Sequence, residues 1–230
     1  MKQPRRAVIA LGSMLALCLW CPGAEPKPVG HDRLVKGAGV DQARLRLVAL
    51  LPVVSETDDR RAEKVVEDCL DRLYEGTGWP RVSTVESATR LAPAATTPDS
   101  LLRKASKQVW RKGVLDSTTA RLITRQLGTD AVLTVRINRW ERWPGSDPTH
   151  ARAFVDLTAA LADSSGSLLW KVSGREAVKT PRALLDKLDL TPGAWGVRAR
   201  YGRDFVPGDF VEAVSAVLAR WLRLVPPPPS

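Results

Sequence analysis

Two stretches of alternating apolar and polar residues, joined by a short polar turn, constrain the fold of this chain more than any other feature. The stretches are Ala151–Ala162 and Ser167–Val178. The turn between them, Asp163–Gly166, ends in a glycine, which adopts a positive φ angle without steric cost. A period of two puts apolar side chains on one face of a strand. The pattern therefore predicts an antiparallel hairpin.

The remaining predicted elements alternate between strands and amphipathic helices. Leu45–Val54 is a continuous apolar run, which is typical of a strand buried on both faces. The other predicted strands are Arg81–Val85 and Ala131–Trp140, and helices are expected after the N-caps Asp58 or Asp59, Asp99, Ser117 and Asp209. This order predicts an α/β (α+β) fold: a single mixed sheet of about five strands with an antiparallel hairpin, flanked by amphipathic helices.

The amino terminus resembles an export signal. Lys2, Arg5 and Arg6 precede the apolar segment Ala7–Trp20, and small residues follow it. The segment is shorter than the roughly 20 apolar residues that a transmembrane helix needs. We therefore predict that residues 1–24 are a signal peptide.

Two outcomes of export are open. Leu15–Cys18 resembles the box that precedes the acylated cysteine of bacterial lipoproteins, which favours lipid attachment at Cys18. The alternative is an ordinary signal cleaved near Ala24. With lipidation, the protein is expected in the periplasm, anchored to the outer membrane.

Composition divides the rest of the chain into three parts. Residues 25–43 are rich in proline and glycine and are predicted to be a flexible tether, residues 44–224 the folded domain, and residues 225–230 a proline-rich tail. The formal net charge of +10 favours anionic partners such as lipid headgroups, acidic glycans or acidic proteins. Export argues against nucleic acid as a partner.

Several segments carry a resemblance to a known family. They are the strand LVALLPVV, the LGTDAVL stretch at Leu127–Leu133, and the turn DSSGSLLW at Asp163–Trp170. Over roughly Leu45–Val178 the chain resembles the bacterial envelope α/β domain of the curli secretion channel's periplasmic part, the TolB amino-terminal domain and lipoprotein activators of penicillin-binding proteins. The resemblance implies a non-enzymatic envelope module that binds other proteins or oligomerises.

The sequence offers no pattern for a catalytic, metal or cofactor site. The two histidines, His31 and His150, lie in the tether and at a strand start, without the partners of a nucleophilic triad. Cys69 lies on an apolar stripe with helical spacing, which predicts a buried structural thiol.

The aromatic residues and one irregular segment are the candidate binding features. Trp140, Trp143, Trp170 and Trp195 would suit a sugar-stacking surface, but core packing is the favoured interpretation. The segment 179–207 is long for a connection within a domain. It contains residue types that dominate binding hot spots, and its predicted partner-binding residues are Trp195, Arg198, Arg200, Tyr201 and Arg203.

Together these patterns predict a non-enzymatic, secreted and lipid-anchored envelope protein that binds other proteins in an envelope assembly or secretion system. Two alternatives stay open: an envelope protein that acts on or binds glycan, and a structural subunit of a secretion complex.

Overall fold

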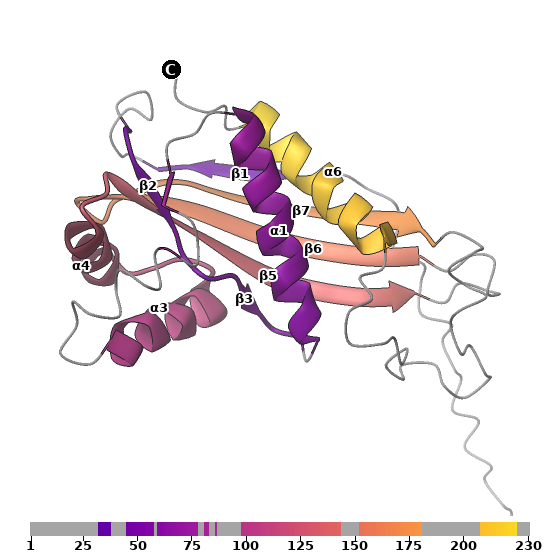
Figure 1. Ribbon diagram of the computed structural model, residues 1–230, viewed down its shortest axis with the longest axis horizontal. Coiled ribbons are helices and arrows are strands. Elements are labelled where there is room, and N and C mark those ends of the chain that lie inside the picture. The colour runs from indigo at the N-terminus through magenta and orange to yellow at the C-terminus, as the bar shows by residue number, and fades with distance from the viewer. Residues whose placement is uncertain are drawn as a thin grey trace, which may run out of the picture.

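The computed structural model describes residues 32–37, 45–57, 59–77, 81–82, 86, 98–143, 152–180 and 208–224. In this part of the chain, one sheet carries helices on both faces (Figure 1). The strands are β1 (Arg33–Lys36), β2 (Val48–Leu50), β3 (Val54–Ser55), β4 (Arg81–Val82), β5 (Ala131–Trp143), β6 (Arg152–Asp163) and β7 (Leu168–Lys179). The helices are α1 (Arg60–Thr77), α3 (Pro98–Lys112), α4 (Ser117–Leu127) and α6 (Gly208–Leu224). The predicted α/β class is confirmed.

The sheet is mixed. The described strands follow the order β1-β7-β6-β5-β2-β4, and β3 also pairs with β5. Strands β5, β6 and β7 form an antiparallel meander, whereas β2 is parallel to both β4 and β5. The sheet thus contains seven described strands rather than the predicted five or so.

One additional strand comes from a break in the apolar run Leu45–Val54. Leu51 still donates its N–H to the Leu133 carbonyl, 3.0 Å away. Pro52 has no N–H to donate, and Val53 donates instead to Oε1 of Glu67 in helix α1, at 3.0 Å. The run therefore forms two short strands, β2 and β3. The predicted burial of β2 on both faces is confirmed, because Val48, Ala49 and Leu50 are 0–2% exposed.

The other additional strand, β1, lies within residues 25–43, where the sequence predicts a flexible tether. Arg33–Lys36 pairs antiparallel with β7 at the edge of the sheet. An ion pair outside the local sequence holds it there: Arg220 Nε of α6 lies 2.7 Å from Asp32 Oδ2. The described residues 32–37 are therefore part of the sheet rather than of a tether. Residues 25–31 and 38–43 lie outside the described residues.

The predicted hairpin between β6 and β7 is confirmed. Its turn is closed by Asp163, whose Oδ1 accepts the N–H of Ser165 and that of Ser167, each at 2.9 Å. Gly166 has the expected positive φ, 83°.

Helix α4 shows a shift of one residue from the prediction. Ser117 is its first helical residue, and Asp116 is the N-cap, accepting the Thr119 N–H at 2.7 Å. An aspartate carboxylate is a strong capping group, so the helix starts immediately after it. The helix ends at Gly128, which adopts a left-handed conformation with φ 66°.

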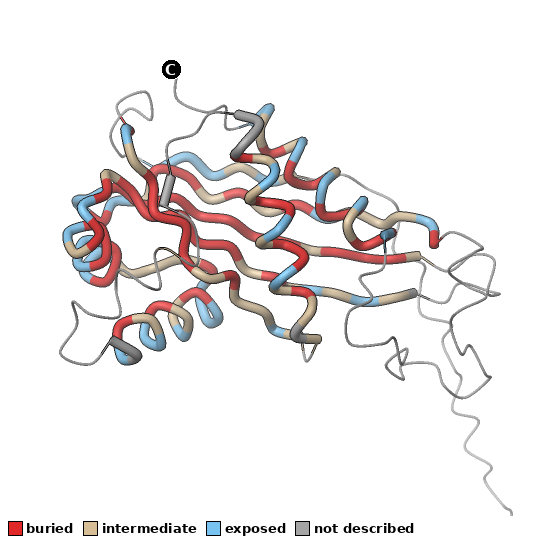
Figure 2. Tube along the Cα trace, viewed as in Figure 1, coloured by how far each residue is buried: buried red, intermediate tan, exposed pale blue. Residues whose placement is uncertain are grey.

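The helices divide between the two faces of the sheet. Helices α1 and α6 cover one face, and α3 and α4 pack on the other (Figure 1). Buried residues are concentrated along the central strands and on the inner sides of the helices (Figure 2). Cys69, on the inner side of α1, lies in the core and is 4% exposed, which confirms the predicted buried thiol.

Candidate functional site

The α3/α4 face is covered only in part by described helices. Successive side chains of a strand point to opposite faces of the sheet. In β6, Val155, Leu157 and Ala159 enter the core with α1 and α6, and the residues between them lie on the α3/α4 face. We call the mostly polar part of that face the open face. It consists of Arg33, Val35, Arg136, Asn138, Asp156, Thr158, Lys171, Ser173 and Arg175.

The register of the sheet arranges these residues in rows across the strands. Arg33 of β1 is opposite Ser173 of β7, which is opposite Thr158 of β6. In the neighbouring rows, Asp156 is opposite Arg175, and Lys171 is opposite Val35. Residues opposite one another on a face have Cβ atoms about 4.5–5.5 Å apart. The rows therefore bring basic and hydroxyl side chains from strands distant in sequence into one area.

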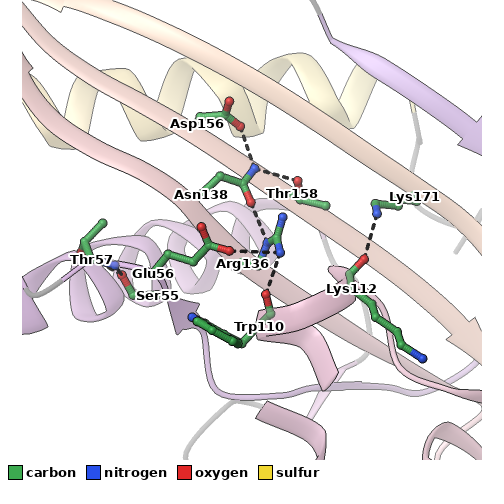
Figure 3. A network of polar contacts seen from close by, with 10 residues as sticks. All are labelled: Ser55, Glu56, Thr57, Trp110, Lys112, Arg136, Asn138, Asp156, Thr158 and Lys171. Atoms are coloured by element: carbon green, nitrogen blue, oxygen red, sulfur yellow. Dashed lines mark hydrogen bonds and ion pairs between the residues drawn. The ribbon is translucent and has the colours of Figure 1, made fainter. Parts of the chain in front are cut away.

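The carboxyl-terminal end of helix α3 borders the open face (Figure 3). Arg136 Nη1 donates to the Trp110 carbonyl at 2.7 Å, and Lys171 Nζ donates to the Lys112 carbonyl at 3.2 Å. The last carbonyls of a helix have no partner within the helix and carry the negative end of its dipole. The two cations thus stabilise the end of α3.

Asn138 links three strand residues in the centre of this network. Its Oδ1 accepts from Arg136 Nε at 2.7 Å, and its Nδ2 donates to Asp156 Oδ1 at 2.7 Å and to Thr158 Oγ1 at 2.9 Å (Figure 3). The β5–β6 register shifts between Ile137 and Arg139. Asn138 is therefore the bulged residue, and such bulges redirect a side chain.

A hollow of about 440 Å³ lies on the open face. Its charged lining residues are Arg33, Asp156, Lys171 and Arg175. Neither Arg33 nor Arg175 forms an ion pair through its side chain with any described residue. Burial lowers the pKa of Lys171, and repulsion from Arg136 and Arg33 lowers it further. The described lining therefore holds more positive than negative charge.

Strand β1 forms the border of this face and of the sheet. Gly37 donates its N–H to the Leu169 carbonyl at 2.8 Å. Because bonded and non-bonded pairs alternate along an antiparallel ladder, Arg33 and Val35 also direct their backbone groups to β7. Leu34 and Lys36 direct theirs to the outer side, which pairs with no described strand.

The side chain of Arg220 fixes the position of β1 relative to the helices. In addition to Asp32, it contacts Glu176 of β7 through an ion pair, and its Nη2 donates to the Arg175 carbonyl at 2.9 Å. One guanidinium of α6 therefore joins the edge strand and its neighbour, so the edge is held in a defined orientation.

The site residues predicted from the sequence lie outside the described residues. These are the lipid-attachment candidate Cys18 and the partner-binding candidates Trp195, Arg198, Arg200, Tyr201 and Arg203. The residues of the open face were not predicted. A signal for them exists in β7, where Lys171, Ser173 and Arg175 alternate with apolar or small residues, but their neighbours on β1 follow only from the strand register.

Two of the four tryptophans considered for sugar stacking have core roles. Trp170 is 6% exposed in the core, and the Trp140 ring stacks on Phe210 with centroids 4.2 Å apart. This supports core packing for that pair. Nothing is described for the side chains of Trp143 and Trp195.

The described part of the chain lacks two further features. It contains no group of three or more His, Cys, Asp or Glu residues that could hold a metal ion. None of its helices is long and apolar enough to cross a membrane.

Comparison with known proteins gives solved structures only. No protein-family model matches the sequence, and no curated protein matches it. A PelC dodecamer from Paraburkholderia phytofirmans is 15% identical, with 83% of this chain and 96% of that chain covered and a TM-score of 0.41. The lipoprotein GNA1162 from Neisseria meningitidis is 16% identical, over 61% of this chain and 90% of that chain, with a TM-score of 0.41.

A third solved structure, the hypothetical protein CT253 from Chlamydia trachomatis, is 12% identical, over 76% of this chain and 94% of that chain, with a TM-score of 0.43. No function is transferred to this chain from likenesses at these scores. Membership of the envelope family that the sequence resembles stays a prediction.

Proposed function

We propose that this chain is a non-enzymatic, exported envelope protein, anchored through a lipid on Cys18, that binds another protein in an envelope assembly or secretion system. The observation that carries the protein-binding part is strand β1. Its outer side directs the backbone groups of Leu34 and Lys36 away from the sheet, without a described strand to pair with them. Such an edge is a template for strand addition by another chain.

The charges of β1 favour an acidic segment of a different protein as the added strand. Arg33 and Lys36 stand at the two ends of the strand, and both are exposed. Two β1 strands paired with each other would bring the Arg33 and Lys36 cations of both copies to one edge, and like charges repel. An acidic strand would instead place opposite charges there.

Residues 195–203 are proposed to add specificity to this interaction. The segment contains Trp195, Arg198, Arg200, Tyr201 and Arg203, and Arg, Trp and Tyr dominate binding hot spots. This part of the proposal rests on the sequence alone.

Replacing Cys18 by serine is expected to release the protein from the membrane fraction. The signal-like segment and the lipoprotein-like box support lipidation, and buried acyl chains contribute about 0.8 kcal/mol per methylene to membrane binding. Fractionation of cells, with mass spectrometry of the mature amino terminus, measures this. A mature, unmodified chain that starts at Glu25 would contradict the anchor and leave export intact.

A lipid on Cys18 would also limit how far β1 can lie from the membrane. Cys18 and Asp32 are 14 residues apart, so β1 would stay within about 50 Å of the membrane.

Strand addition at β1 predicts different results for two substitutions of the same residue. Lys36→Pro removes the charge and the outward N–H, whereas Lys36→Ala removes only the charge; proline is tolerated at sheet edges. With a photo-crosslinking residue at position 35, we expect the crosslinked partner to be lost at least five-fold in Lys36→Pro and largely kept in Lys36→Ala. Peptide sequencing should place the crosslink in an acidic segment.

Three outcomes would contradict strand addition by an acidic partner. Equal yields from both variants would show that the outward N–H is not used. Loss in both would show a contact made by the Lys36 charge alone. A crosslinked species of twice the chain's mass would identify a second copy, as expected of a structural subunit. Thermal melting of both variants verifies that the fold is kept.

A further inference from the structure

We propose that the hollow on the open face binds an acidic sugar, a pyranose that carries a carboxylate. Arg33, Lys171 and Arg175 would bind the carboxylate, and Asp156, Asn138 and Thr158 would bind the hydroxyl groups. The site shares Arg33 with β1 but not the outward backbone groups of Leu34 and Lys36, and its test involves neither Cys18 nor a crosslinked partner.

The excess of positive charge indicates an anionic ligand. Three cations line the hollow with the single carboxylate of Asp156, counting the described lining residues. Arg33 and Arg175 have no acidic partner among the described residues, and Lys171 Nζ makes one described hydrogen bond, to the Lys112 carbonyl. An ammonium group has three N–H donors, so Lys171 can donate to a ligand while it keeps this bond. A bound anion would also reduce the repulsion among these cations.

Asp156 distinguishes a sugar from other anions. Its Oδ1 accepts from Asn138, and its Oδ2 accepts no hydrogen bond from a described residue. A carboxylate accepts hydrogen bonds and, when ionised, donates none. It would therefore repel phosphate or a segment rich in carboxylates, but would accept a hydroxyl group. A uronic acid presents one carboxylate and several hydroxyls. The carboxylate matches the three cations of the hollow, and a hydroxyl matches the acceptor Asp156.

The neutral groups and the size of the hollow agree with this ligand. Thr158 Oγ1 accepts from Asn138, which leaves its own O–H as a donor, and the Ser173 hydroxyl lies in the same row. The hollow of about 440 Å³ lies in the lower part of the range of small-molecule pockets, roughly 300–1,000 Å³. It is bordered by the sheet on one side and is open on another, so an end or an internal unit of an acidic glycan can enter.

Calorimetric titration of the full chain in non-ionic detergent tests the proposal. The probes are glucuronate, an oligogalacturonate, glucose, polyglutamate and inorganic phosphate. We expect glucuronate or the oligogalacturonate to bind at least ten-fold more tightly than glucose, polyglutamate and phosphate. Preference for the oligogalacturonate over glucuronate would identify a polymer as the source of the sugar, and the reverse would identify a free sugar.

Matched variants connect the binding to the hollow. The double variant Arg33→Gln/Arg175→Gln should weaken binding of the acidic sugar at least ten-fold, since both cations lose their charge. Arg121→Gln, an exposed arginine on α4, should leave it unchanged. Asp156→Asn should weaken the sugar and strengthen phosphate, because the repelling carboxylate is gone.

Four results would overturn the proposal. They are glucose binding as tightly as glucuronate, tighter binding of phosphate or of polyglutamate when Lys36→Pro blocks the outer edge of β1, no binding of either acidic sugar, and an unchanged affinity in the double variant. Circular dichroism of each variant verifies folding before the titration.

Discussion

Replacing Asp209 by alanine is expected to lower the free energy of unfolding by about 3–5 kcal/mol, because it takes the Asp209 carboxylate away from the largely buried Arg142 guanidinium. The Asp209 side chain is 0% exposed and that of Arg142 is 14% exposed, with 2.8 Å between Arg142 Nη2 and Asp209 Oδ2. Thr180 Oγ1 donates to the same Oδ2 at 2.8 Å. Asp209 therefore joins the end of β5, the end of β7 and the start of α6. Urea unfolding followed by circular dichroism measures the effect.

Two controls separate this buried ion pair from general effects on helix α6. Glu212→Ala removes an exposed carboxylate from the same helix and should change stability by no more than about 0.5 kcal/mol. The double variant Asp209→Ala/Arg142→Met should recover part of the loss, since the buried guanidinium is removed together with the Asp209 carboxylate. If Asp209→Ala costs less than about 1 kcal/mol, the bonds to Arg142 and Thr180 do not stabilise the fold.

The same residue shows how far local sequence patterns lead. The sequence predicts Asp209 as the N-cap of the last helix, whereas α6 begins at Gly208 and Asp209 lies within its first turn. Its main partner, Arg142, is 67 residues away in the chain. A capping pattern extends over a few residues and gives no information about a partner at that distance.

Strand β1 could not be predicted either, because its position also depends on partners that are distant in the sequence. Its four residues, RLVK, lie among glycines and prolines, and only Leu34 packs against the core. Its position depends on pairing with β7 and on the ion pair between Asp32 and Arg220, which are 188 residues apart. By contrast, the long alternating strands and the amphipathic helices carry their own periodicity, and they were predicted nearly to their ends.

Some residues of the candidate site could be placed from local sequence patterns, and others could not. The alternation in β7 shows that one side of the strand is polar, so Lys171 and Arg175 could have been placed together from the sequence. That Arg33 stands beside them depends on the register with β1, and that Asn138 faces them depends on a bulge. Neither feature has a local pattern. The loop candidates from Trp195 to Arg203 lie outside the described residues and stay a prediction.

Replacing Gly166 by alanine is expected to lower the free energy of unfolding by about 2–5 kcal/mol, from two additive causes. A left-handed residue with a Cβ costs about 1–2 kcal/mol, and Gly166 has φ 83°. Its Cβ would also lie 2.1 Å from the Ser117 carbonyl oxygen, so the start of α4 must move, at about 1–3 kcal/mol. The sequence predicts the positive φ of this turn, but the contact with α4 appears only in the structure.

Gly128→Ala provides the matched control for Gly166→Ala, because it separates backbone strain from steric contact. Gly128 has a similar φ, 66°, and an added Cβ would meet no atom within 4 Å. This variant should therefore lose only the strain, about 1–2 kcal/mol. Urea unfolding of both variants gives the difference that belongs to the contact between the β6–β7 turn and α4. Equal losses would mean that the turn and the helix start separate freely, so that the hairpin does not fix the position of α4.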